Sequence, residues 1–233
     1  MHQASTFFFS NIASHGGYVY YYSVDLKHRW GEGIATRDQI WVQPLGTPTV
    51  GMACFKAYEA TGNRFYLDAA TKAAEALVYG QLQSGGWTNC VDFDPRGGRV
   101  AQYRNGRGGG NPVRRPLREN NSSLDDGQTQ SAIQLLVRVD KALGFQRKDV
   151  HESVRVALDA LLAAQFPNGG FPQVWTGPVT KQPVIETLME IYRVTSDRKY
   201  LEPIPRALVY LKRSILPDGK LARYYELKTN NPH

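Results

Sequence analysis

Cysteine and histidine are scarce in this sequence, which excludes several kinds of metal enzyme. Only two cysteines, Cys54 and Cys90, occur among 233 residues. Two thiols are too few for a Cys-rich zinc site, and the sequence alone does not show whether they form a disulfide. The histidines also lack the spacing of metal ligands; they are His2, His15, His28, His151 and His233. We therefore do not expect a zinc enzyme.

Long apolar runs are missing as well. No stretch approaches the ~20 apolar residues of a membrane-spanning helix, and the aromatic run 7–9 is too short to be a signal-peptide core. We expect no membrane partner, and any export signal would lie outside this sequence. With 42% hydrophobic and 21% charged residues, the composition is that of an ordinary globular protein.

Acidic residues are outnumbered by basic ones, 21 to 28, which leaves a net charge of +7. A basic surface favours anionic partners such as nucleic acid, phospholipid head groups or an acidic polysaccharide. We do not expect nucleic acid, because the arginine-rich part of the chain has one aromatic residue, Tyr103, and no known nucleic-acid-binding module.

Three similar segments recur along the chain. Residues 76–87 align with residues 160–171, with five of twelve positions identical and a final aromatic residue in both. Residues 207–210 repeat the Ala-Leu-Val-Tyr quartet of residues 76–79, and Leu216-Pro217-Asp218-Gly219 follows. Recurrence of this kind is typical of folds that stack one structural unit repeatedly.

Each repeat is predicted to be two helices followed by a glycine turn. We predict the first helices at about 49–61, 127–143 and 185–196, from apolar residues at three-and-four spacing. Their apolar residues surround more of the helix than those of the second helices, so we expect them to be buried inside. The prediction is an all-α protein, an α/α toroid of repeated helical hairpins spanning residues 49–233, with its glycine turns on one rim. A linear helical solenoid is the alternative.

Two segments interrupt the repeats. Residues 1–48 form an irregular, aromatic-rich N-terminal segment that we expect to pack on the toroid, with a strand or hairpin around 18–22. Residues 93–123 form an excursion rich in arginine and glycine. Its composition favours a solvated, partly disordered loop, and a flap that grips a polyanion is the alternative.

Carboxylates cluster weakly near the expected rim. Asp125 and Asp126 suit the start of a helix, where acidic side chains meet the helix dipole, and we favour this interpretation over a metal site. Asp92 follows the first glycine turn and could reach the same rim, and calcium prefers such oxygen ligands. Lys220 and Arg223 are typical of surface cations near a helix end.

Several motifs resemble pectate lyases of polysaccharide lyase family ten. They are Gly85-Gly86-Trp87, the stretch 124–130 (LDDGQTQ), the stretch 168–173 (NGGFPQ) and the stretch 222–230 (ARYYELKTN). The resemblance covers most of the chain from about residue 49 onward, and the segment through Trp41-Val42-Gln43-Pro44 is similar to a divergent bacterial branch.

This resemblance implies an α/α toroid that cleaves polygalacturonate by β-elimination. It implies that Arg223 removes the C5 proton of the uronate, and that Asp92 and Asp125 hold calcium; Asp126 occupies a position where relatives can carry Asn. The proton lies α to a carboxylate, so a metal and cations such as Lys220 would stabilise the developing charge. An arginine base requires desolvation and crowding by other cations, because its pKa is ordinarily ~12.5 or more. Tyr224 and Lys220 are the alternative bases.

The resemblance also implies sugar-stacking aromatic residues and a location. Tyr224, Trp87 and Trp175 could stack on sugar faces, although aromatic rings of this kind are more often buried. We expect a monomer acting on an anionic polysaccharide in an extracellular or periplasmic location.

One departure from the family concerns ring closure. Relatives carry another helical pair between the Phe-Pro-Gln-x-Trp turn and the helix beginning Glu186-Thr187-Leu188, and this chain passes between them directly. The ring is therefore expected to be incomplete or shortened. Two alternatives to the lyase follow: a non-catalytic carbohydrate-binding toroid, and a glycoside hydrolase using Asp92 and Asp125 as its two carboxylic acids.

Overall fold

The computed structural model describes residues 2–94, 96, 101–107, 120–175, 185–222, 225 and 231–232. The α-helices are α1 (His2–Phe7), α2 (Thr47–Thr61), α3 (Arg64–Gly80), α4 (Gln128–Ala142), α5 (Lys148–Ala163), α6 (Ile185–Thr195) and α7 (Ile204–Arg213). A π-helical segment, η1 (Phe8–Ile12), continues α1, and the 3₁₀ segments η2 (Asp125–Gly127) and η3 (Arg198–Leu201) precede α4 and α7. The strands are β1 (Tyr21–Tyr22), β2 (Arg29–Trp30), β3 (Gln39–Trp41), β4 (Cys90–Asp92), β5 (Ser122–Ser123) and β6 (Val174–Trp175).

The helices form successive antiparallel pairs, α2–α3, α4–α5 and α6–α7, as the repeats predict. Local sequence explains the break within the first pair. Gly62 ends α2 in the left-handed conformation at φ 67°, and the Asn63 side chain then caps α3 by accepting from the Phe65 backbone N–H. Glycine adopts positive φ without strain, and Asn is among the preferred N-cap residues.

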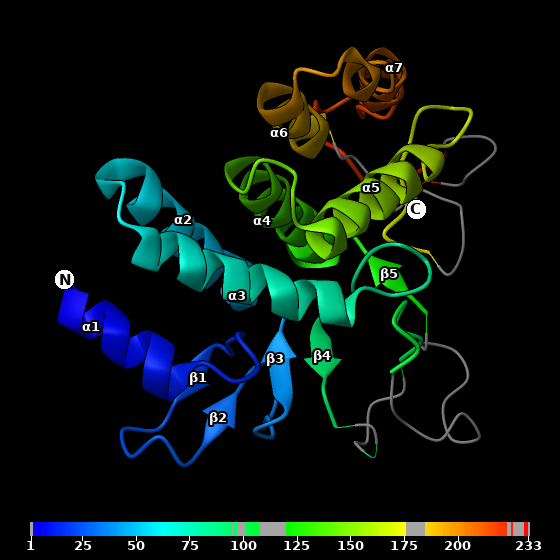
Figure 1. The fold of residues 1–233 in the computed structure, drawn as a ribbon. Coiled ribbons are helices and arrows are strands. Elements are labelled where there is room, and N and C mark those ends of the chain that lie inside the picture. The colour runs from blue at the N-terminus through cyan, green and yellow to red at the C-terminus, as the bar shows by residue number, and fades with distance from the viewer. Residues whose placement is uncertain are drawn as a thin grey trace.

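The pairs lie beside one another in chain order (Figure 1). Helix α4 contacts both α2 and α6, and α3 contacts α5, so α2, α4 and α6 form one row and α3 and α5 lie outside it. Gly51 marks the closest approach of α2 and α4, because a Cβ there would lie 2.4 Å from a Leu135 methyl group. The core is formed largely by α3, α4 and α5, where Leu67, Leu77, Leu136 and Leu161 are fully buried.

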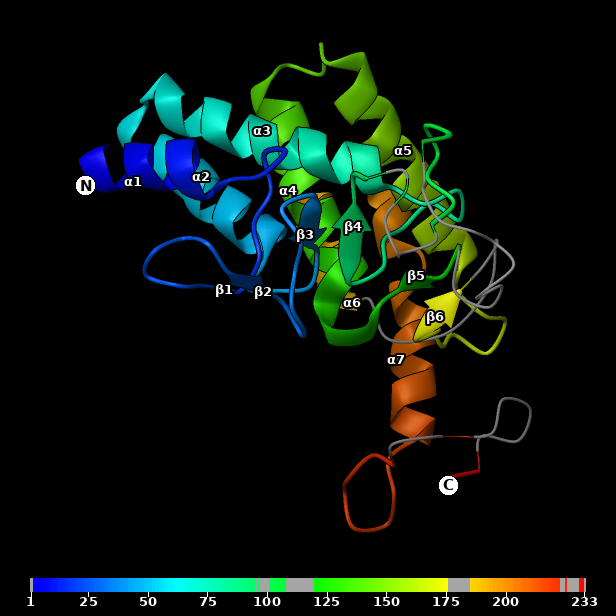
Figure 2. The same ribbon diagram turned by 90° about the horizontal axis from the view of Figure 1, so that it is seen from below.

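The prediction that the first helix of every pair is the more buried is wrong for α2. Helix α2 buries Thr47, Pro48, Gly51 and Phe55, whereas its partner α3 buries ten residues. Helices α4 and α6 do bury more residues than their partners α5 and α7. Helix α2 is less covered because it lies at the open end of the row, where the described chain supplies only α1 and η1 as further neighbours (Figure 2).

The three glycine turns share one backbone structure, which confirms the repeat. In each turn, the first residue accepts a backbone hydrogen bond from the residue three positions on and donates one to the residue four positions on, at 2.8–2.9 Å. These bonds join Leu82 to Gly85 and Gly86, Phe166 to Gly169 and Gly170, and Leu216 to Gly219 and Lys220. The central glycines have φ values of 96°, 96° and 82°, where a side chain would be strained.

A glutamine before each of the first two turns ties that turn to the next helical pair. Gln81 donates to the carbonyl of the first turn glycine at 2.8 Å and to that of Ser153 in α5 at 2.9 Å. Gln165 makes the corresponding bonds at 3.1 Å to its own turn and at 2.8 Å to Pro203, just before α7. The repeated sequence therefore repeats a junction between neighbouring hairpins.

The N-terminal segment is joined to the toroid by strand pairing. The expected hairpin is present as β1–β2, with Tyr21 opposite Trp30. Strand β3 then pairs antiparallel with β4, placing Gln39 opposite Asp92 and Trp41 opposite Cys90. Among the described residues, no helix has both the length and the apolar character needed to cross a bilayer.

The arginine-rich excursion is ordered where the structure describes it. Tyr103 is buried and its hydroxyl accepts from the Asp92 backbone N–H at 2.8 Å. Arg104 donates to the Gln81 side chain at 2.7 Å and lies 3.4 Å from the Glu152 carboxylate. Residues 101–107 are therefore anchored to the fold through Tyr103 and Arg104, while residues 102 and 104–107 are exposed, as expected of a solvated loop. Most of the segment expected to form a polyanion-gripping flap lies outside the described residues.

Candidate functional site

The first two glycine turns meet where the inner helices begin. Ser84 of the first turn hydrogen-bonds with Ser122 of β5 at 2.7 Å, and its carbonyl accepts from the Trp175 indole of β6 at 2.8 Å. Strands β5 and β6 pair with each other, and η2 and α4 follow β5 directly. These two turns therefore share a rim, as predicted, whereas the third turn lies beyond the end of α7 (Figure 2).

The two rim tryptophans are structural, so the proposal that they stack on sugars is wrong. Trp87 is 0% exposed and Trp175 is 2% exposed. The Trp87 indole donates to the Leu77 carbonyl at 2.7 Å, and the Trp175 indole donates to Ser84. Each ring is enclosed in the core that joins neighbouring hairpins, which leaves neither face for a substrate.

Asp92 is also part of the framework. It is 3% exposed, and its carboxylate accepts from the Gln39 side chain at 2.9 Å across the β3–β4 pair. The same carboxylate accepts from the Asp94 backbone N–H at 3.1 Å. Its hydrogen bonds and burial give Asp92 a sufficient structural role. The glycoside hydrolase alternative, which pairs this buried carboxylate with Asp125, stays a prediction.

Asp125 and Asp126 are exposed at the start of η2, immediately before α4. The Asp125 backbone N–H is capped by the Ser123 hydroxyl at 3.0 Å. Asp126 has φ 46° and ψ 26°, a left-handed conformation that costs free energy in a residue other than glycine. Its carboxylate accepts from the Gln43 side chain at 3.0 Å. Such strain at an exposed acid is typical of functional positions.

Asp126 belongs to a group that we call the rim cluster: Tyr20, Glu32, Gln43, Asn89 and Asp126. The Asn89 amide donates to the Glu32 carboxylate at 2.7 Å. The Asn89 backbone carbonyl accepts from the Val42 backbone N–H at 2.8 Å. This bond holds Asn89 beside the segment that carries Gln43. The rim cluster thus joins the N-terminal segment, the first turn and the start of α4.

Tyr20 lies among these acids. Burial raises the pKa of its hydroxyl above the ordinary value, and the nearby charges of Glu32 and Asp126 raise it further. The hydroxyl oxygen is buried and has no hydrogen-bond partner among the described residues. Tyr20 therefore stays protonated at neutral pH, with a buried hydroxyl that is unpaired among the described residues.

Close packing at a glycine positions Glu32. A Cβ on Gly31 would lie 2.0 Å from the Trp41 ring, so only glycine allows the chain to pass over this buried indole. The edge of the same indole faces the Tyr20 ring, at 6.2 Å between ring centroids. The buried tryptophan of β3 thereby supports two members of the rim cluster.

A groove lies over the inner face of α4, lined by chain neighbours of the rim cluster but by none of its five residues. Two adjoining cavities of about 270 and 320 Å³ share Ser131 and Gln134 of α4. The first is also lined by Pro44 and Gly127, the chain neighbours of Gln43 and Asp126, and by Glu186 at the start of α6. The second extends to α2 and is lined by Pro48, Thr49, Met52, Ala53 and Lys56. We call this the inner-face groove.

The structure describes only part of the predicted C-terminal site, which consists of Lys220, Arg223 and Tyr224. Arg223 and Tyr224 lie outside the described residues. Lys220 is on the third turn, where its side chain is 80% exposed and lies 3.5 Å from the Asp218 carboxylate. This surface pair agrees with the interpretation of Lys220 as an ordinary cation.

The predicted calcium site is not assembled from its three aspartates within the described chain. No three His, Cys, Asp or Glu side chains gather as a metal site in that part of the molecule. Asp92 lies opposite Gln39 at the end of β4, three residues beyond Asn89. In an extended chain, three residues separate Asp92 from Asn89 by ~10 Å.

The sequence did not single out Glu32, Gln43 or Asn89 as site residues. The Trp-Val-Gln-Pro stretch that carries Gln43 was nevertheless among the resembling motifs.

Comparison with known proteins identifies a related family for part of the chain. Residues 99–182, which include Asp125 and Asp126, match the sequence model of the pectic acid lyase family. No curated protein sequence matches the chain.

Solved structures show that the fold is an α/α toroid. The chain is similar to a D-mannose isomerase with a TM-score of 0.57 and 16% identity, over 96% of this chain and 55% of that one. It is similar to the cellobiose 2-epimerase of Spirochaeta thermophila with a TM-score of 0.53 and 16% identity, over 80% and 47% of the two chains. A family 10 polysaccharide lyase from Cellvibrio cellulosa aligns with a TM-score of 0.42 and 19% identity, over 64% and 48%. The chain thus spans about half the length of these proteins.

Proposed function

We propose that the protein cleaves an acidic polysaccharide, polygalacturonate in the first instance, by calcium-assisted β-elimination at the rim cluster and inner-face groove. The observation that carries this proposal is the match of residues 99–182 to the pectic acid lyase family. The matched range contains Asp126, the strained acid that the structure joins to Gln43.

The oxygen-rich rim cluster suits a hard cation. Glu32 and Asp126 each bring a carboxylate near Tyr20, a pair of acids and not a group of three, since no three such side chains gather among the described residues. The Gln43 side-chain oxygen is buried without a hydrogen-bond partner in the same part of the chain. Carboxylate and amide oxygens are preferred calcium ligands. Calcium bound there would neutralise the substrate carboxylate and make the neighbouring C5 proton more acidic.

The chain's own residues would then orient the sugar and move the proton. In β-elimination, a base takes the proton from C5, a C4–C5 double bond forms and the glycosidic oxygen leaves C4. The family resemblance implies Arg223 as the base. Its described neighbours Ala222 and Tyr225, however, are hydrogen-bonded to each other and to Ser214 at the end of α7, not to the rim cluster. We therefore assign no base within the rim cluster. The protonated Tyr20 hydroxyl is placed to donate a hydrogen bond to an oxygen of the substrate, and the inner-face groove provides polar contacts for neighbouring sugar units.

The test is production of the unsaturated sugar. Purified protein is incubated with polygalacturonate, with calcium or with a chelator, and ultraviolet absorbance of the double bond is followed. We expect product only with calcium, and a loss of ~100-fold or more in Asp126→Ala, since removing one electrostatic contact to the transition state typically costs that much. Asp68→Ala, at an exposed position of α3, is the matched control and should keep full activity. Absence of product under all conditions would reject the lyase.

A non-catalytic carbohydrate-binding toroid is the second candidate. It is favoured by the direct passage from the Phe-Pro-Gln-x-Trp turn to the helix beginning Glu186-Thr187-Leu188, without the helical pair that relatives carry between them. Binding of polygalacturonate in affinity electrophoresis, without any product, would support this candidate over the enzyme.

A further inference from the structure

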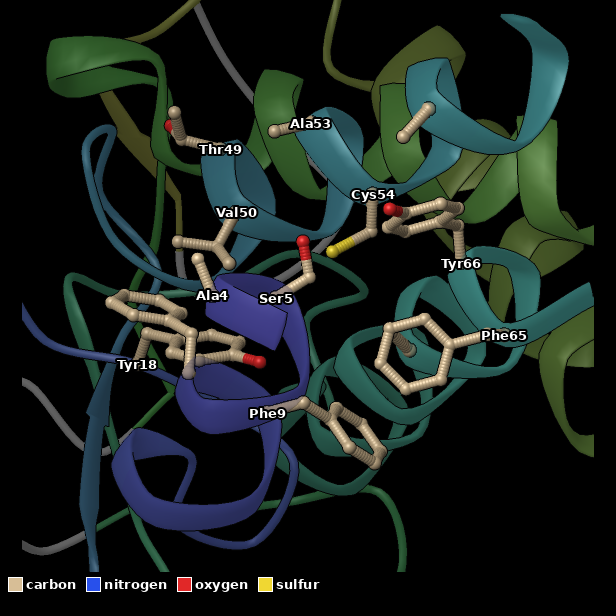
Figure 3. A pocket seen from close by; sticks show the side chains of 13 residues that line it. Ala4, Ser5, Phe9, Tyr18, Thr49, Val50, Ala53, Cys54, Phe65 and Tyr66 are labelled. Carbon is tan, nitrogen blue, oxygen red and sulfur yellow. The ribbon is translucent and has the colours of Figure 1, made fainter. Parts of the chain in front are cut away.

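Two cavities adjoin the N-terminal segment and differ in their chemistry. One, of about 490 Å³, opens between α1–η1 and the α2–α3 pair, and its walls are mostly apolar or aromatic side chains such as Phe9 and Phe65 (Figure 3). The other, of about 350 Å³, is formed by the end of η1, the β1–β2 hairpin and the segment after β2. It is lined by Lys27, Arg29 and Arg37, and no acid is among the described residues that form it. We call this second cavity the arginine pocket.

Arg29 of β2 is fixed in the arginine pocket through one of its three guanidinium nitrogens. The residue is buried, at 9% exposure. Its Nη1 donates to the backbone carbonyls of Thr36 and Arg37, each at 2.8 Å, which uses both hydrogens of that nitrogen. Its Nε and Nη2 are also buried, and they have no hydrogen-bond partner among the described residues. No described carboxylate therefore bonds to this edge of the guanidinium.

The unpaired edge is the one that recognises oxyanions. The N–H groups of Nε and Nη2 point the same way, and they match two oxygens of a carboxylate or a phosphate. The guanidinium stays charged in proteins, and a buried charge without a hydrogen-bonded partner costs considerable free energy. The Tyr22 ring lies 5.7 Å from the Arg29 Cζ, a distance at which an aromatic face attracts a cation. The ring offers no oxygen to the two donors, so their partner is expected to be a ligand.

The remaining lining residues set the charge and size of that ligand. Lys27 and Arg37 are exposed, which places positive charge at the mouth of the pocket. Lys27 lies 3.7 Å from the exposed Asp25 carboxylate, a solvated pair that leaves its attraction for an anion only partly offset. A volume of 350 Å³ is within the range of pockets that take small organic molecules. The pocket therefore has room for more than an isolated inorganic ion.

We propose that the arginine pocket binds a small molecule through its carboxylate or phosphate group. Nε and Nη2 of Arg29 donate to two oxygens of that group, and Lys27 and Arg37 attract it at the mouth. The pocket shares no residue with the rim cluster or the inner-face groove. The proposal is therefore independent of the proposed lyase activity.

Calorimetry on the native chain tests the site and identifies the anionic group. Glucose 6-phosphate, gluconate and neutral glucose are titrated separately at one ionic strength, with a chelator present so that no calcium-dependent site contributes. We expect binding of at least one of the two anions and none of glucose. The anion that binds more tightly identifies the group as phosphate or carboxylate. Failure of both anions to bind would overturn the proposal.

Two variants locate the binding. Arg29→Lys keeps the charge but loses the paired N–H groups, so the affinity for the tighter anion should fall by ~10–100-fold. Arg64→Gln, at the exposed start of α3, removes one positive charge elsewhere and should bind like the native chain. Circular dichroism establishes that both variants are folded. Unchanged affinity in folded Arg29→Lys would contradict the site.

Nuclear magnetic resonance gives a readout that needs no variant. The Nε–H signal of Arg29 in the native chain is assigned through its Overhauser contacts with the Tyr22 ring. We expect the tighter anion to shift this signal to lower field as the hydrogen bond forms, and glucose to leave it in place. A signal that does not move at saturating anion would overturn the proposal even if Arg29→Lys fails to fold.

Discussion

Gln43 donates its side-chain N–H to the Asp126 carboxylate at 3.0 Å, across 83 positions of sequence. This bond joins the N-terminal segment to the start of α4. It also holds Asp126, in its left-handed conformation, next to Gly127, which lines the inner-face groove. The candidate site therefore depends on contacts between two parts of the chain that the repeats do not relate.

We expect Gln43→Ala to lower lyase activity by ~10–100-fold, because supporting hydrogen bonds to ligating groups typically contribute that much. The loss should be larger at low calcium than at saturating calcium if Asp126 is a ligand. Steady-state rates over a calcium titration would measure it. Gln146→Ala, at an exposed position after α4, is the control and should not change the rates. Equal losses at all calcium concentrations would argue against a ligating role for Asp126.

Gly31 and Gly33 form a matched pair for testing the support of Glu32. A Cβ on Gly31 would overlap the Trp41 ring, whereas a Cβ on Gly33 meets nothing within 4 Å. We expect Gly31→Ala to lower the free energy of unfolding by ~1–3 kcal/mol, as overpacking commonly does. Gly33→Ala should be nearly neutral. Urea denaturation of both variants measures the difference, and similar losses would contradict the packing described for Trp41.

The turn glutamines should differ in their contribution to stability. Gln81 is fully buried and binds two carbonyls and Arg104, whereas Gln165 is half-buried. We expect Gln81→Ala to lower the free energy of unfolding by ~2–3 kcal/mol, because it leaves buried carbonyls without partners. Gln165→Ala should cost less, since water reaches its partners. The comparison uses chemical denaturation at one pH, and a reversed order would contradict the assignment.

The Asp140–His151 pair predicts a pH dependence of stability. Burial raises the pKa of the Asp140 carboxyl above its ordinary value of 3.8, while the hydrogen bond and charge of His151 at 2.8 Å oppose that rise. A raised pKa in the folded state means that this group's contribution is full below the ordinary value and is lost as pH rises through the folded pKa. Relative to Asp140→Asn, the native protein should therefore lose stability between about pH 3.8 and neutrality.

His151→Ala should make that loss larger, because the buried carboxylate then loses the hydrogen bond that opposes the rise in its pKa. Asp149→Asn supplies a control of opposite sign. Arg147 lowers the pKa of the Asp149 carboxyl, so its contribution is present above the ordinary value and is lost as pH falls. Urea unfolding from pH 3 to 7 would compare the wild type with Asp140→Asn, His151→Ala and Asp149→Asn. A wild-type curve parallel to that of Asp140→Asn would refute the assignment for Asp140.

The helices were predictable because their determinants are local. The predicted first helices, 49–61, 127–143 and 185–196, correspond to α2, α4 and α6 within two residues at each end. Apolar spacing, Gly62 and Asn63 act over one or two turns, so sequence alone carries them. The degree of burial of α2 was not predictable, because it depends on which neighbours surround the helix.

The candidate site was predictable only in part. Asp125 and Asp126 stand out as adjacent acids before a helix, and the structure places both at the rim. The roles of Trp87, Trp175 and Asp92 were misjudged, because a residue beside a turn can point inward or outward with the same sequence around it. Their burial follows from contacts with β3, β5 and the core.

The sequence by itself determined the repeated hairpins, their glycine turns and the basic charge, since each arises from residue type and short-range spacing. Only the tertiary structure decided that Glu32, Gln43 and Asn89 meet Asp126 at one rim. Those residues come from strands and loops far apart in the chain, and the pairing of β3 with β4 brings them together. Long-range pairing depends on the whole packed core, and no local pattern encodes it.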